Sequence, residues 1–250
     1  MGERVNIVCV AGFPGAGKSS LCSALADSGD FHTEEVDDHK NRIIEALHTG
    51  SDDSRTLREI LGHFIASTHL PGFETSRHLR GEVLNLLRMS ESQLLHVLST
   101  QPRVFESVIS YCAQHSALQS AAKKAKQNKD QRIIFPGASL TTSLGRDVSL
   151  KYFQYQGIIP NILIVKARID HLMQTEQDRK RGTKHSDNQI NRTNFAINES
   201  SPVHPAEEWH GVHVLNNQRT MDPSELADSV RNRLLACHEN TITRQIGFLI

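Results

Sequence analysis

The sequence predicts an α/β fold in which a parallel sheet of five strands is covered by helices. Short apolar runs rich in valine and isoleucine recur along the chain, as expected of strands buried on both faces. Segments with apolar residues at three- and four-residue spacing separate these runs, and helical connections of this kind join parallel strands. The first apolar run also passes directly into a glycine-rich loop followed by a helix.

The first strand is expected over residues 5–11, VNIVCVA, a nearly continuous apolar run. The glycine-rich loop follows it. The next stretch, KSSLCSALADSG, places Leu21 and Leu25 at helical spacing and stops at Gly29, a residue type common just after helices. Strand, loop and helix therefore follow one another without interruption.

The other strands come at intervals through the chain. A second strand is predicted over residues 31–36, ending at Asp37 and Asp38, with a helix starting at His39. Residues 131–140 indicate a third strand and a turn, followed by a helix that ends at Gly157. The fourth and fifth strands are predicted over 159–167 and 211–217, and the last helix over 222–240.

Residues 50–129 differ from the rest because strand patterns are absent and three segments carry helical periodicity. We therefore predict a core formed by residues 1–49 and 130–250, and a helical insertion formed by residues 50–129.

The composition argues against several classes of protein. Lys plus Arg and Asp plus Glu are equal at 28 each, and aromatic residues are 5%, so neither nucleic acid nor a membrane is an expected partner. No apolar run reaches the roughly 18 residues that a membrane span needs. The 4 cysteines form no C-x-x-C pair. This suits a reducing compartment, and we expect a cytoplasmic protein.

The loop from Gly12 to Ser19, G-F-P-G-A-G-K-S, satisfies the phosphate-binding pattern G-x-x-x-x-G-K-[ST]. Its glycines let backbone N–H groups point inward, Lys18 supplies positive charge at the β- and γ-phosphates, and the Ser19 hydroxyl can bind Mg²⁺. We therefore expect a nucleoside triphosphate and Mg²⁺ as ligands. The predicted nucleotide-binding residues of this loop are Gly12, Pro14, Gly15, Ala16, Gly17, Lys18, Ser19 and Ser20.

With this loop, the chain resembles the P-loop kinases of small molecules and nucleotides. These include adenylate and other nucleoside monophosphate kinases, dephospho-CoA kinase, shikimate and gluconate kinases, and the zeta toxins. The resemblance is specific at the loop and elsewhere rests on the order of elements. It implies the P-loop NTPase fold. The GTPase patterns N-K-x-D and D-x-x-G are absent, which favours a kinase over a switch protein.

The predicted third strand ends I-I-F-P-G, whereas most P-loop proteins place an aspartate there. By resemblance to shikimate, gluconate and dephospho-CoA kinases and zeta toxins, Asp37 or Asp38 would orient the acceptor hydroxyl or accept its proton. The alternative is that one of them caps the following helix.

The same resemblance implies a lid at about residues 168–200 that closes over the phosphates. Arg179 and Arg181 would stabilise the transferred group, and Arg168 would contact the nucleotide. Asn216, after the last strand, would lie along the adenine. Arg146 is a candidate ligand of an acceptor phosphate, and the insertion is the expected acceptor-binding region.

The sequence thus predicts an ATP-dependent kinase acting on a nucleotide-, nucleoside- or metabolite-like acceptor. The acceptor itself stays open. A non-catalytic nucleotide-binding module and a nucleotide hydrolase are the alternatives.

Overall fold

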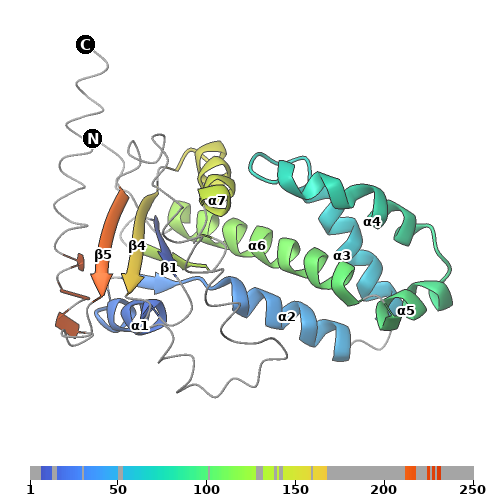
Figure 1. Ribbon diagram of the computed structural model, residues 1–250, viewed down its shortest axis with the longest axis horizontal. Coiled ribbons are helices and arrows are strands. Elements are labelled where there is room, and N and C mark those ends of the chain that lie inside the picture. The colour runs from blue at the N-terminus through green and yellow to red at the C-terminus, as the bar shows by residue number, and fades with distance from the viewer. Residues whose placement is uncertain are drawn as a thin grey trace, which may run out of the picture. The chain divides into compact units, whose positions relative to one another are not determined.

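A computed structural model of the chain describes residues 7–12, 16–29, 31–49, 53–100, 102–127, 132–137, 140, 143–158, 160–167, 212–217, 224–225, 227–228 and 230–231 (Figure 1). The chain divides into two compact units. The sheet unit comprises residues 1–34 and 121–250, and the helical unit comprises residues 35–120.

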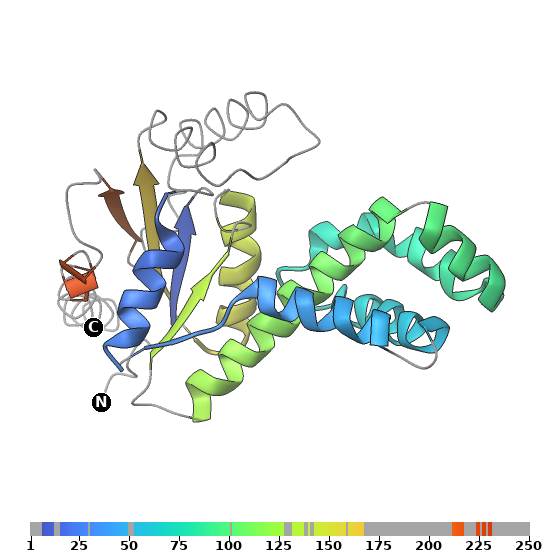
Figure 2. The same ribbon diagram turned by 90° about the horizontal axis from the view of Figure 1, so that it is seen from below.

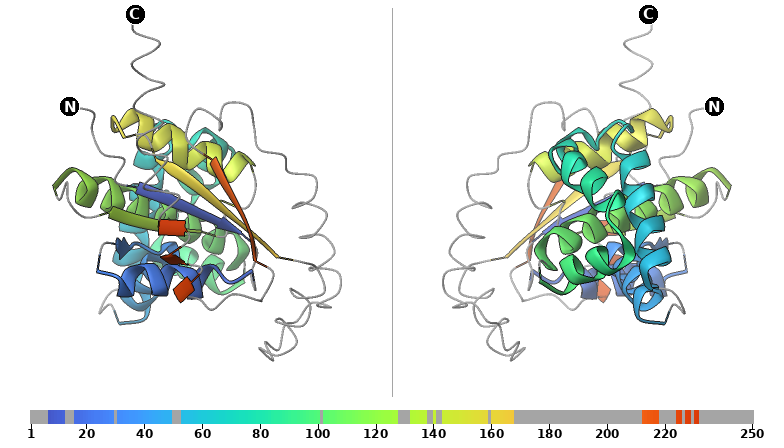
Figure 3. Two further views of the ribbon diagram at one scale, coloured as in Figure 1. Left: turned by 90° about the vertical axis from the view of Figure 1, so that its left-hand side faces the viewer. Right: turned by 90° about the vertical axis from the view of Figure 1, so that its right-hand side faces the viewer.

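The sheet unit is built on five parallel strands in the order β2-β3-β1-β4-β5, which confirms the predicted sheet. The arrows of β1, β3, β4 and β5 point the same way in Figure 2. Figure 3, in its left-hand view, shows the twist between neighbouring strands. The strands are β1 (Ile7–Gly12), β2 (Phe31–Thr33), β3 (Arg132–Pro136), β4 (Asn161–Ala167) and β5 (Val212–Asn217).

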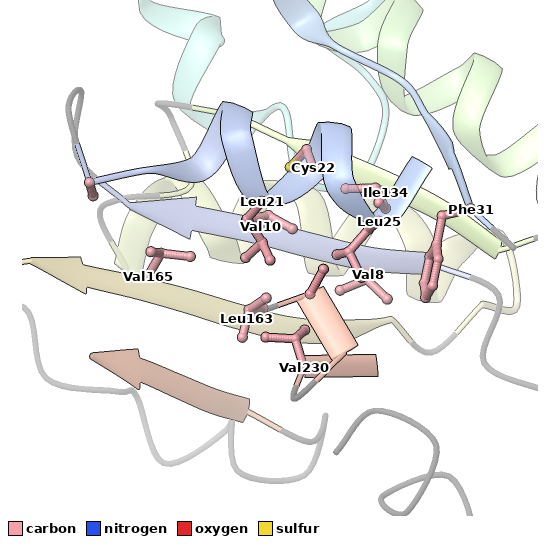
Figure 4. Packing of buried hydrophobic residues seen from close by; sticks show 12 residues of the cluster. Val8, Val10, Leu21, Cys22, Leu25, Phe31, Ile134, Leu163, Val165 and Val230 are labelled. Atoms are coloured by element: carbon pink, nitrogen blue, oxygen red, sulfur yellow. The ribbon is translucent and has the colours of Figure 1, made fainter. Parts of the chain in front are cut away.

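Successive residues of a strand point to opposite faces, and both faces of this sheet are covered. On one face, Leu21 and Leu25 of helix α1 (Lys18–Asp27) pack against Val8 and Val10 of β1 (Figure 4). On the other face, Phe135 of β3 meets a ring of α7 (Ser143–Tyr155) edge-on, at a centroid distance of 5.8 Å. β1 lies in the middle of the order, and its described residues are fully buried.

The helical unit has a hydrophobic core of its own, centred on Leu57, Leu61, Phe64 and Phe105. It begins at residue 35, earlier than the predicted insertion, because the helix after β2 packs with the next helix. It ends at residue 120, earlier than predicted, because the last part of its final helix belongs to the sheet unit. Its elements are α2 (Val36–Thr49), α3 (Asp53–Ser67), the 3-10 helix η1 (Glu74–Leu79), α4 (Arg80–Leu87), α5 (Glu91–Thr100) and α6 (Pro102–Gln127).

The turn between α4 and α5 is held by side chains. The Ser90 N–H donates to Gln93 Oε1 at 2.9 Å, and the Gln93 N–H donates back to Ser90 Oγ at 3.4 Å, which is a capping box at the start of α5. The Arg58 guanidinium donates to the carbonyl oxygens of Leu87 and Met89 at the end of α4. The positive charge of Arg58 also interacts favourably with the negative end of the α4 helix dipole.

Among the residues that the structure describes, no helix combines the length and the apolar character that a membrane crossing would need. The described cysteines, Cys9, Cys22 and Cys112, are buried and form no disulfide.

Candidate active site

The glycine-rich loop leaves the sheet at Gly12, where the backbone is tightly packed. Gly12 is buried with a φ of +153°, a value that L side chains rarely adopt. A Cβ at this position would lie 2.6 Å from the carbonyl oxygen of Val165 on β4. Glycine is therefore required for β1 to run this close to β4 at the point where the loop begins.

The loop re-enters regular structure at Gly17, which has a left-handed φ of +93° and precedes the first residue of α1. Gly17 provides no side-chain cap, and the first turn of α1 contains no acidic residue. The N–H groups of a first helical turn have no acceptor within the helix, and the dipole there favours an anion. This end of α1 thus suits a bound phosphate group.

The Lys18 ammonium donates a hydrogen bond of 2.6 Å to the carbonyl oxygen of Gly12, which joins the two ends of the loop. Ser19 and Ser20 are exposed in the first turn of α1, so both hydroxyls are accessible. Pro14 and Gly15 lie outside the described residues. Within the part of the chain that is described, no three His, Cys, Asp or Glu side chains gather into a metal site.

Asp37 and Asp38 do not follow a strand, and the prediction that placed them there is wrong. β2 ends at Thr33 and α2 begins at Val36, so both aspartates lie exposed in the first turn of α2. Acidic residues are favoured at this end of a helix because they interact with its dipole. Their proposed role toward an acceptor stays a prediction.

The acidic residue that directly follows β2 is Glu34, which the sequence analysis missed. It is only 5% exposed, and its carboxylate accepts a hydrogen bond from the Lys124 ammonium. Glu34 follows Thr33, which pairs with Ile134, itself paired with Val8. Glu34 is therefore level with Cys9 of β1, which is three residues, or about 10 Å along the strand direction, before Gly12. This carboxylate belongs to the packing of the sheet edge.

The segment after β3 carries no acidic side chain among its described residues. The Gly137 N–H donates to the carbonyl oxygen of Val10, and β3 ends at Pro136 as the sequence suggested. Arg146, on α7, is buried, with 2% of its surface exposed, and donates a hydrogen bond of 3.1 Å to the carbonyl oxygen of Leu140. This contact holds the segment after β3, and the predicted binding of an acceptor by Arg146 stays untested.

The predicted lid residues Arg168, Arg179 and Arg181 lie outside the described residues. Asn216 was predicted to follow the last strand, but it is the next-to-last residue of β5, paired with Lys166 of β4. β5 ends at Asn217, where the predicted strand over residues 211–217 also ends, so Asn216 lies within the strand and not after it.

A buried strand, the G-x-x-x-x-G-K-S loop and a helix with an uncapped start, set at the middle strand of this sheet, define a P-loop protein. No protein-family model matches the chain, and no curated protein matches it. Among solved structures, it is similar to a provisionally named kinase from Chloroflexus aurantiacus, with a TM-score of 0.53, 14% identity, and coverage of 94% of this chain and 99% of that one. This likeness shows that the chain has the fold of the P-loop kinases.

Two further matches have lower scores. A gluconokinase from Sinorhizobium meliloti is 13% identical, with a TM-score of 0.46 over 97% of this chain and 99% of that one. A sugar kinase from Janibacter sp. is 16% identical, with a TM-score of 0.43 over 92% and 94%.

Proposed function

We propose that this protein is an ATP- and Mg²⁺-dependent kinase that transfers the γ-phosphoryl group to a small-molecule acceptor, nucleotide-, nucleoside- or metabolite-like. The observation that carries the proposal is the joined loop, in which Lys18 bonds to the Gly12 carbonyl oxygen at the carboxyl end of the central strand. Ligands of open parallel sheets bind at these strand ends.

In this proposal the Lys18 ammonium exchanges the Gly12 carbonyl oxygen for phosphate oxygens when the nucleotide binds. The backbone N–H groups at the start of α1 donate to the same phosphates. Ser19 would hold Mg²⁺, which supplies positive charge at the β- and γ-phosphates. Arg168, Arg179 and Arg181 would add positive charge around the transferred group, and Asn216 would lie along the adenine.

Transfer forms a bond between the acceptor hydroxyl oxygen and the γ-phosphorus. The bond from that phosphorus to the β–γ bridging oxygen breaks, and ADP leaves. The hydroxyl proton passes to Asp37 or Asp38, which would orient the acceptor. Residues 50–129, most of which belong to the helical unit, would bind the acceptor, and Arg146 of the sheet unit is a separate candidate ligand.

The test is acceptor-dependent ATP consumption across a panel of small molecules, with Lys18→Ala compared with Lys123→Ala. Lys123 is an exposed lysine of α6 and controls for the loss of one positive charge. Lys18→Ala should lower acceptor-dependent turnover by about a hundredfold or more, because it removes the positive charge that stabilises the γ-phosphoryl group during transfer. Equal activity in the two variants would refute the role of the loop.

One observation favours a second candidate, a non-catalytic nucleotide-binding module. β3 ends in Pro136-Gly137, without the acidic residue that most P-loop enzymes have there. Such a module would bind a fluorescent ATP analogue in a Lys18-dependent way and show no turnover with any acceptor. Turnover without an acceptor would indicate the third candidate, a nucleotide hydrolase.

A further inference from the structure

Two histidines join helices α3 and α6 inside the helical unit. His115 Nδ1 and His63 Nε2 are 3.1 Å apart, and the ring centroids are separated by 5.0 Å. A hydrogen bond between two imidazole nitrogens needs one N–H donor and one bare nitrogen acceptor. The contact is therefore lost when both of these nitrogens carry protons.

The surroundings of His115 resist its protonation. The ring is 5% exposed and meets the edge of Phe73 at a centroid distance of 5.2 Å. Burial, and then the neighbouring His63, lower the pKa of His115 to about 4. His63 is the titratable group that faces it from α3. One turn earlier on α6, Cys112 bonds to the Ile60 carbonyl oxygen, and burial raises the pKa of its thiol to about 12, so it stays neutral.

A histidine in the sheet unit shows a different arrangement. His32 Nε2 accepts a hydrogen bond of 2.7 Å from the Lys124 ammonium, and Glu34 Oε2 lies 3.8 Å from the same nitrogen. The neighbours of this histidine therefore carry charges of both signs. In the helical unit, the charge that acts on His115 is that of another histidine.

We propose that the His63–His115 pair is a pH-sensitive joint of the helical unit, which holds α3 to α6 at neutral pH and releases them on acidification while the sheet unit keeps its packing. Since acceptor binding is placed in the helical unit, a point that rests on the proposed function, acid would weaken acceptor binding before nucleotide binding.

The direction follows from the linkage between protonation and folding. The pKa of His115 is lowered to about 4 in the folded unit from an ordinary value near 6.5. The stabilisation is therefore complete above the ordinary value, and it falls as the pH decreases from about 6.5 to about 4. The effect should begin at a milder pH than the titration of ordinary carboxylates.

Hydrogen exchange of the whole chain tests the joint, with protection compared at about pH 7 and about pH 5 after correction for intrinsic rates. Protection of α3 and of α6 up to Ser120 should fall about tenfold in the native sequence, while β1 and β4 keep theirs. His115→Asn places an amide near Nδ1 without titrating, and His63→Gln does the same near Nε2. Both should reduce the loss, whereas His96→Asn, at an exposed histidine of α5, should leave it unchanged.

Titration of the His115 ring by NMR is a second measurement, and it does not depend on whether the His115 variant folds. A His115 pKa near the ordinary histidine value would overturn the proposal. So would an equal loss of protection in the native chain and in folded His63→Gln, or an equal loss in the sheet and helical units.

Discussion

The Lys18 ammonium and the Gly12 carbonyl oxygen, 2.6 Å apart, close the glycine-rich loop on itself. The carbonyl that accepts this bond belongs to a residue that lies close against β4, since a Cβ on Gly12 would lie 2.6 Å from the Val165 carbonyl oxygen. The position of the catalytic candidate Lys18 is therefore coupled to the packing of β1 against β4.

Replacing Gly12 by alanine should damage both the fold and the loop. The added methyl group meets backbone rather than a flexible side chain, so the two strands must separate. We expect a loss of about 1–3 kcal/mol in the free energy of unfolding, the range for overpacked interiors. Nucleotide affinity should fall as well. Denaturant unfolding and titration with an ATP analogue measure the two effects.

Gly62→Ala is the matched control for this substitution. Gly62 lies within α3, and a Cβ there would meet nothing within 4 Å. Alanine should therefore stabilise the helix by about 0.4–1 kcal/mol. If Gly12→Ala is as harmless as Gly62→Ala, the close approach of β1 to β4 does not exist in solution.

The Glu34–Lys124 pair should contribute to stability because one partner is buried. Glu34 is 5% exposed and the Lys124 side chain is 40% exposed. Lys124→Met leaves the carboxylate without its ammonium partner, and we expect a loss of about 1–3 kcal/mol. Lys126→Met, which removes an exposed lysine bonded to Gln156, should change stability by less than about 0.5 kcal/mol.

A double-mutant cycle separates the pair from general effects of the lysine. In Lys124→Met/Glu34→Gln, the buried charge is absent, so part of the loss should be recovered. If the double variant loses as much stability as the two single variants together, Glu34 and Lys124 do not interact.

The parts of the fold that the sequence predicted correctly are specified by local pattern. The apolar run of β1, the glycine-rich loop and the amphipathic start of α1 are contiguous, and each has a physical signature within a few residues. The break between α4 and α5 is also encoded locally, by the Ser90 and Gln93 side chains.

The errors come from pairing over long distances. β2 has three residues because only the start of β3 pairs with it, which no local pattern reveals. The sequence analysis extended this strand to residue 36 and so placed Asp37 and Asp38 at a strand end. Likewise, Lys124 is 90 residues from Glu34, and His115 is 52 residues from His63. Contacts of this kind depend on the tertiary fold and cannot be read from one sequence.

Replacing both Asp37 and Asp38 by asparagine separates a capping role from a catalytic one. Both are exposed in the first turn of α2, where a negative charge contributes about 0.3–1 kcal/mol through the helix dipole. The proposed function predicts more: acceptor-dependent transfer should be lost while affinity for an ATP analogue is kept. Glu91→Gln removes an acidic residue from the first turn of α5 and should lower stability slightly without affecting transfer. Retained transfer in Asp37→Asn/Asp38→Asn would leave the two residues with a structural role only, because the dipole interaction is then their whole contribution.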